Sequence, residues 1–227
     1  SINAVEDVVA TQCYPRDAQA ILLVELDGLE VEVKTNKQRV AEICLNCGAR
    51  NITSAHDQET RLKLWKGRKA AFAAMGKISP DYFVQDGVVP RSKLAQVLAE
   101  INSLSEKYGY AIANVFHAGD GNLHPLILYD NKVEGSFEKV EELGGEILKL
   151  CVKVGGSISG EHGIGSDKKC YMADMFTETD LETMQRVKKS FNPKGLANPD
   201  KIFPTPRTCG ESANSQKFIS TKGVEVF

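Results

Sequence analysis

The chain has 227 residues, of which 42% are hydrophobic and 26% charged, and this composition excludes intrinsic disorder and collagen-like structure. Its 28 basic and 30 acidic residues give a net charge of -2, so a basic surface for nucleic acid or for an anionic membrane is not expected. The longest apolar run, AILLV at 20–24, is far shorter than the roughly 20 residues of a membrane-spanning helix.

The first third of the chain shows the patterns of strands and amphipathic helices. QAILLVEL at 19–26 has the length and apolar density of a strand, and a helical pattern then runs to the CxxC pair at 44–47. Because this pair closes a helix before Gly48, its thiols are predicted to be structural, not redox-active or metal-binding. A short strand is predicted at 51–56 and an amphipathic helix at 58–74.

The remainder continues the alternation and then changes character. Strands are predicted at 82–89, 111–116 and 123–128, with helices from Pro90 to Tyr108, at 134–154 and, after an N-cap at Thr177, at 177–190. Strands and helices in this order predict an α+β fold, with helices on one face of a mostly antiparallel sheet and a mainly helical annex after it. The predicted division is a sheet domain at 1–155, a glycine-rich loop and helical annex at 156–206, and a loose tail at 207–227.

The segment NVFHAGDGNLHPLIL at 114–128 carries two of the four histidines. If Asp120-Gly121 form the centre of a hairpin turn, residues whose numbers sum to 241 face each other. His117 and His124 are then cross-strand partners with Cβ atoms about 4.5–5.5 Å apart, close enough to bind one metal ion. An exposed hairpin end with two polar residues is the alternative interpretation.

A second motif, GGSISGEHGIG at 155–165, surrounds Glu161 and His162 with glycines, which suits a backbone that turns sharply close to a ligand. It lacks the GK[ST] ending of a phosphate-binding loop, and a plain surface loop is the alternative. Together with the hairpin, it provides a set of two histidines and a carboxylate: His117, His124 and Glu161. Such a set is typical of an open catalytic site for Zn²⁺ or another divalent metal, and it leaves His162 as a base.

Several long motifs occur in one order: WKGRKAAF, DYFVQDGVVPR, HAGDGNLHP, GGSISGEHGIG and FNPKGLANPDKIFP. In this order they resemble the C-terminal half of the FAD-linked oxidases that act on D-2-hydroxy acids, a family of glycolate oxidases, D-lactate dehydrogenases and D-2-hydroxyglutarate dehydrogenases. The resemblance runs from residue 3 to residue 206. It implies a ferredoxin-like α+β cap or substrate domain with a helical C-terminal annex. It also implies that FAD is held mainly by an N-terminal domain, which is expected to be absent from this chain.

The resemblance implies roles for individual residues. His117, His124 and Glu161 match the metal ligands of metal-dependent relatives, and His162 matches their proton-abstracting histidine. Arg68, in WKGRKAAF, matches an arginine that binds the substrate carboxylate, a task that suits a bidentate guanidinium. A solvated helix face is the alternative for Arg68.

Two further stretches bear on cofactor and substrate. Asn198, in ANPDKIFP, matches a position near the flavin, with a simple turn residue as the alternative. Where hydroxyglutarate relatives have a substrate-binding lysine, this chain has Phe83, Val84 and Gln85 before Asp86. The loss of a second cation disfavours a dicarboxylate and leaves a small monocarboxylate such as glycolate or D-lactate.

The implied function is oxidation of a 2-hydroxy acid, glycolate to glyoxylate before D-lactate, with hydride transfer to FAD and no activity of this chain alone. The implied partners are the N-terminal FAD domain and other glycolate oxidase subunits, including an iron–sulfur subunit, but no nucleic acid. A cytoplasmic location follows, with possible peripheral attachment to the inner membrane through those subunits. A metallohydrolase that activates water with the same side chains, and a sensing module without catalysis, are the rival classes.

Overall fold

The structure is a computed structural model that describes residues 2–9 and 14–204, so the predicted tail at 207–227 lies outside the described residues. The chain divides into two compact units, Ser1–Ile78 and Ser79–Phe227. The domain boundary at residue 155 stays a prediction.

The first unit is helical, with α1 (Ile2–Val9), α2 (Glu30–Asn46) and α3 (Gln58–Met75). α1 packs on α3, and both contribute small or apolar buried residues: Ala4, Val5, Ala71, Ala74 and Met75. α3 begins after Asp57, whose side chain accepts a hydrogen bond from Thr60 N at 2.7 Å, as an N-cap does. α2 and α3 confirm the two predicted helices, whereas α1 was not predicted.

Two predicted strands of the first unit are wrong. Residues 19–26 and 51–56 form neither strand nor helix, and Leu22 and Val24 are 62% and 50% exposed. A strand needs a neighbour to complete its backbone hydrogen bonds, and no described strand pairs with either segment. The predicted position of the CxxC pair is confirmed, because Cys47 is the C-cap of α2, and the thiols of Cys44 and Cys47 are free.

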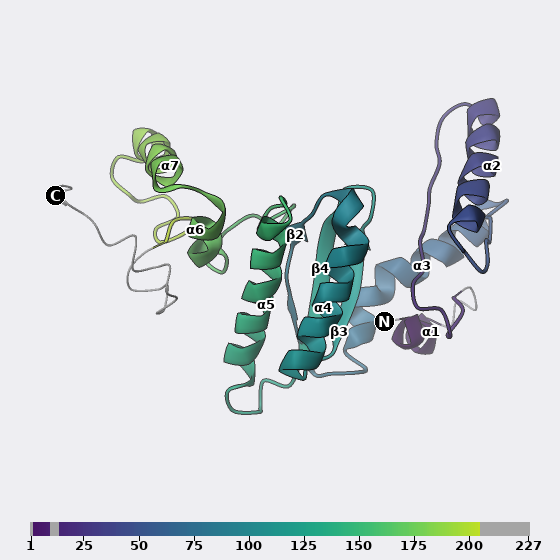
Figure 1. Cartoon of the computed structure of the whole chain (residues 1–227), viewed down its shortest axis with the longest axis horizontal. Helices are drawn as coiled ribbons and strands as arrows, with labels where there is room; N and C mark the ends of the chain where they lie inside the picture. The colour runs from purple at the N-terminus through teal and green to yellow at the C-terminus, as the bar shows by residue number, and fades with distance from the viewer. Residues whose placement is uncertain (1, 10–13, 205–227) are drawn as a thin grey trace. The chain divides into compact units, whose positions relative to one another are not determined.

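The second unit contains an antiparallel sheet of β1 (Asp81–Val84), β2 (Gly87–Val88), β3 (Ile112–His117) and β4 (Asn122–Tyr129). β4 is central, with β1 and β2 along one edge and β3 along the other. One face is covered by α4 (Leu94–Tyr108), which follows a 3-10 turn at Arg91–Lys93, and by α5 (Ser136–Lys153) (Figure 1). The core between them includes Val97, Ile101, Leu123, Ile127 and Ile147. The predicted α+β fold is confirmed.

The predicted register of the β3–β4 hairpin is wrong. His117 pairs with Asn122 and Val115 pairs with His124, so the turn comprises residues 118–121 instead of centring on two residues. The turn fits against the neighbouring segment, because Val89 N donates to Gly121 O at 2.9 Å. Gly121 has φ +72°, and a Cβ there would lie 2.0 Å from Val89 O. This close approach and the positive φ both require glycine at the last position of the turn.

The C-terminal part of the second unit is helical, as predicted, with a 3-10 turn at Lys169–Tyr171, α6 (Met172–Met175) and α7 (Glu178–Phe191). The Thr177 side chain accepts from Asp180 N, which confirms the predicted N-cap. Buried side chains join this part to α5: Leu148, Ile158, Met172 and Leu181. No described helix is long and apolar enough to cross a membrane.

Candidate active site

The face of the sheet away from α4 and α5 carries the candidate site. Leu123 and Ile127 of β4 point into the core under the helices, so Asn122 and His124 point to the opposite face. His117, the partner of Asn122, lies on that face as well. The observed β3–β4 pairing differs from the predicted one by two residues, and such a shift keeps every side chain on its face of the sheet. His117 and His124 are therefore still neighbours, in diagonal instead of directly opposite positions.

The glycine-rich segment approaches the same face. Val88 and Ser157 exchange two backbone hydrogen bonds of 2.9 Å, which fix the start of this segment beside β2. A Cβ on Gly160 would lie 2.5 Å from Asn122 Oδ1, so only glycine allows this approach to β4. The segment thereby places the next two residues, Glu161 and His162, over His124.

The structure brings together His117, His124 and Glu161. Their possible ligand atoms lie within 4.8 Å of one another, and His124 Nε2 is 3.1 Å from Glu161 Oε1. The rings of His117 and His124 meet edge to face, with centroids 5.5 Å apart. His124 is buried, whereas the other two side chains are exposed.

His162 lies beside this set. Its ring stacks on that of His124, with centroids 5.2 Å apart and an interplanar angle of 14°, and its Nε2 lies 3.8 Å from Glu161 Oε1. Burial lowers the pKa of His124 below its usual value, and the negative charges of Glu161 and Asp86 offset only part of this effect. A neutral His124 can offer a ring nitrogen lone pair to a cation. The exposed side chain of His162 can reach a ligand on the open side of the site.

The donor set of His117, His124 and Glu161 fits a divalent cation. Ligands at about 2.0–2.2 Å from a tetrahedral Zn²⁺ are separated by about 3.3 Å, so the observed spacing needs only small side-chain movements. Two imidazoles and one carboxylate leave coordination positions for a small ligand.

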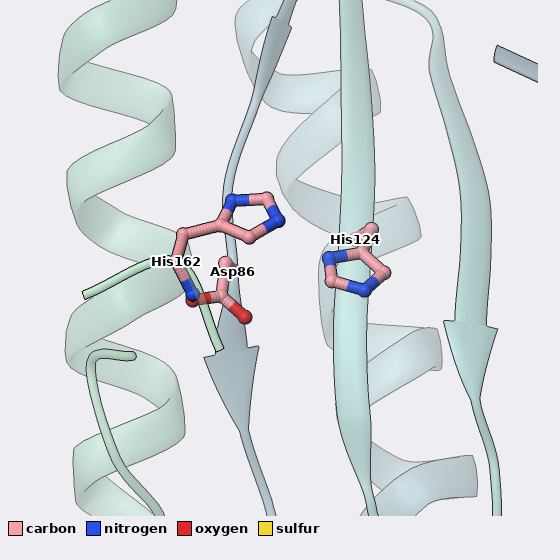
Figure 2. A group of neighbouring side chains, drawn as sticks. All are labelled: Asp86, His124 and His162. Carbon is pink, nitrogen blue, oxygen red and sulfur yellow. The ribbon is translucent and has the colours of Figure 1, made fainter. Parts of the chain in front are cut away.

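A second group of possible ligands, Asp86, His124 and His162, also lies within reach of one point (Figure 2). Its carboxylate is already engaged. Asp86 Oδ2 accepts hydrogen bonds from the backbone N–H of His162 and from Lys168 Nζ, at 3.0 and 3.2 Å. A cation there would lie next to the Lys168 ammonium group and share a carboxylate whose charge that group already balances, so Glu161 is the better carboxylate ligand.

The other two predicted residues lie elsewhere. Asn198 has φ +46° and its carbonyl oxygen accepts from Lys188 Nζ at 3.2 Å, an arrangement that suits a turn residue beside α7. Arg68 is half-buried on α3, in the first compact unit. The roles of both residues stay predictions.

Two buried charged residues beside the candidate site, Asp86 and Lys168, were not predicted from the sequence. Asp86 lies within the strand predicted at 82–89, and a carboxylate in that position was the available signal. Lys168 is followed by Lys169, and adjacent lysines are typical of a solvated surface. The burial of Lys168 therefore could not be predicted from the sequence.

The sequence that forms this fold and this site matches a domain of flavin-dependent oxidases. The family described as "FAD linked oxidases, C-terminal domain" matches residues 1–202, and the chain belongs to it. The resemblance inferred from the motifs is confirmed.

Among curated relatives, the chain is 52% identical over 211 residues to glycolate oxidase subunit GlcD of Escherichia coli (strain K12), covering 93% of this chain and 42% of the relative. It is 33% identical over 189 residues to the subunit of the same name from Bacillus subtilis (strain 168), covering 83% of this chain and 40% of that relative. It is 32% identical over 199 residues to a D-lactate dehydrogenase of Archaeoglobus fulgidus, covering 87% of this chain and 42% of that relative. The chain therefore spans less than half the length of these relatives.

A solved structure of 4-ethylphenol oxidase from Gulosibacter chungangensis, in complex with isoeugenol, is similar with a TM-score of 0.57. The match covers 78% of this chain and 38% of the other at 17% sequence identity. At this identity the likeness concerns the fold alone.

Proposed function

We propose that this chain is the C-terminal substrate domain of a flavoprotein that oxidises a small 2-hydroxy acid, with glycolate as the favoured substrate and D-lactate as the alternative. The observation that carries the proposal is the imidazole of His162, stacked on His124 beside Glu161 and open to a ligand. A base next to a cation site is suited to the removal of a hydroxyl proton.

The proposed chemistry assigns one task to each side chain. His162 accepts the hydroxyl proton of the substrate at a ring nitrogen, and Arg68 binds the carboxylate. His117, His124 and Glu161 would hold a divalent cation, Zn²⁺ or similar, whose charge would favour the deprotonated hydroxyl. FAD, held mainly by an N-terminal domain and approached by Asn198, supplies the hydride acceptor.

The side chains before Asp86 support a monocarboxylate substrate. Phe83 packs edge to face on Phe137, 6.0 Å between centroids. Val84 pairs with Leu126, on the face that carries His124. None of these side chains offers a second cation to a dicarboxylate.

The family membership supports proposals about the surroundings of the domain. We propose that the domain works with its N-terminal FAD domain and with further glycolate oxidase subunits, including an iron–sulfur subunit. A cytoplasmic location, with peripheral attachment to the inner membrane through those subunits, belongs to the same proposal. We also propose that the chain is divided into a sheet domain at 1–155 and an annex at 156–206.

Flavin content and activity test the proposal directly. Purified alone, this chain is expected to show no flavin absorbance and to oxidise neither glycolate nor D-lactate. The full-length protein should bind FAD and reduce an artificial electron acceptor with these substrates, and 2-hydroxyglutarate should be poor. Stoichiometric flavin on the isolated chain would contradict the assignment. Hydrolysis without flavin would indicate a metallohydrolase, and ligand binding without turnover a sensing module.

The Arg68→Ala variant of the full-length protein is expected to raise KM by about 10–100-fold with a smaller effect on kcat. A charge-assisted hydrogen bond contributes about 1.5–3 kcal/mol, and Arg68 would hold the carboxylate in the ground and transition states alike. Steady-state kinetics measure both constants. The neighbouring exposed residue provides the control, Lys69→Ala, which should leave KM unchanged. Equal KM values for the two variants would remove Arg68 from the site.

A further inference from the structure

A buried carboxylate binds the backbone of the residues that form the candidate site. Asp86 is 0% exposed. Its Oδ2 accepts hydrogen bonds from the N–H groups of Gly160, Glu161 and His162, at 3.0, 3.2 and 3.0 Å. The hydroxyl of Ser159 donates to the same oxygen at 2.9 Å. One carboxylate therefore holds four consecutive residues of the glycine-rich segment.

Lys168 completes this arrangement. Its side chain is 8% exposed, and its Nζ donates to Asp86 Oδ2 at 3.2 Å and to the Asp86 backbone oxygen at 2.8 Å. Removing a carboxylate from water is costly unless hydrogen bonds and an opposite charge replace the water. Burial alone would raise the pKa of Asp86, but these donors outweigh it and keep the pKa well below its usual range.

The position of Asp86 in the sheet relates the glycine-rich segment to His124. Asp86 lies between β1 and β2, and both strands pair with β4, which carries His124. Because the carboxylate fixes the backbone of Glu161 and His162, it sets where their side chains emerge relative to His124. Asp86 Oδ2 is occupied by these donors, and Oδ1 accepts a further, longer hydrogen bond from Glu161 N at 3.3 Å.

We propose that Asp86, neutralised by Lys168, is the positioning residue of the site: it holds the backbone of Glu161 and His162 so that the carboxylate and the imidazole meet His124. The inference rests on the proposed function for its effect on turnover, although the anchoring of the segment is independent of it. Asp86 touches neither substrate nor cation in this proposal.

The test is the variant Asp86→Asn in the full-length protein, which keeps the shape of the side chain but removes its charge and replaces one acceptor with a donor. Amide hydrogen exchange of a peptide covering 155–166 is expected to rise at least about tenfold, since protection ends with the hydrogen bonds. Affinity for Zn²⁺ alone and kcat should each fall about 10–100-fold, as for other residues that orient metal ligands. KM for the hydroxy acid should change less than about threefold, because the residues that bind the carboxylate are untouched.

The matched control is Asp81→Asn on β1, where the carboxylate accepts a single backbone hydrogen bond, from Asn131 N at 3.0 Å. It should leave exchange in 155–166, Zn²⁺ affinity and kcat unchanged. If Asp86→Asn does not fold, Ser159→Ala removes one donor to Asp86, together with the hydrogen bond from Gly163 N to Ser159 Oγ at 2.8 Å. It leaves the ion pair and should shift the same quantities in the same direction by a smaller factor.

The proposal is overturned if a folded variant leaves exchange in 155–166 as in the wild type, or raises it while kcat and Zn²⁺ affinity both stay unchanged. A wild-type protein that oxidises no hydroxy acid would overturn the proposed function instead. In that case exchange and Zn²⁺ affinity still decide whether Asp86 positions the site.

Discussion

Replacing His162 with alanine in the full-length protein is expected to lower kcat by about 10²–10⁴-fold, the usual contribution of a general base, with little change in KM. The proton acceptor acts as the O–H bond breaks, so its loss raises the free energy of the transition state and hardly changes the affinity for the substrate. His162 stacks on His124 and keeps an exposed side, so in the proposed mechanism its ring nitrogen receives the proton of the bound hydroxyl. Steady-state kinetics with an artificial electron acceptor measure both constants.

The chain offers a matched control for this experiment. His56 is the one histidine of the sequence outside the candidate site; it is exposed, lies in the first compact unit and belongs to neither group of possible metal ligands. The His56→Ala variant should therefore behave like the wild type. A sensing module would respond to His162→Ala through affinity alone. Unchanged turnover in His162→Ala would exclude this residue from the mechanism and leave the site without its base.

The sequence predicted those parts of the fold whose signals are local. The helix at 58–74 and the N-cap at Thr177 depend on residues within a few positions of one another, and both are in the structure. The strand predicted at 19–26 has an equally strong local pattern. It is wrong because a strand is completed by a partner elsewhere in the chain, and an apolar run carries no information about that partner.

In the candidate site, too, the sequence predicted local relations between residues but not contacts between distant segments. His117 and His124 could be placed on one face because side chains alternate along a strand, and this survives the error in register. Glu161 was added to them because two histidines and a carboxylate are typical of a metal site, and the family resemblance supported the same set, but nothing in the spacing connects the hairpin to the glycine-rich segment. Asp86, which makes that connection, contacts residues 73 to 76 positions away, beyond the reach of any sequence periodicity.

Removal of the divalent cation from the full-length protein is expected to abolish most of the activity, and added Zn²⁺ or a similar ion should restore it. In the proposed site, a cation held by His117, His124 and Glu161 would favour the deprotonated hydroxyl, a contribution on the order of several kcal/mol. Activity after dialysis against a chelator, followed by titration with individual divalent metals, measures the effect.

The Glu161→Gln variant separates a role for the cation from a purely protein-based site. The amide retains the shape of Glu161 near His124 Nε2, 3.1 Å away in the wild type, but it is a much weaker ligand, so Zn²⁺ affinity should fall at least about tenfold. Glu138→Gln, an exposed carboxylate in the first turn of α5, is the control and should bind Zn²⁺ like the wild type. If chelation leaves the rate intact and Glu161→Gln is fully active, no cation takes part. His117 and His124 would then act as hydrogen-bond donors to the substrate, with His162 still accepting the proton.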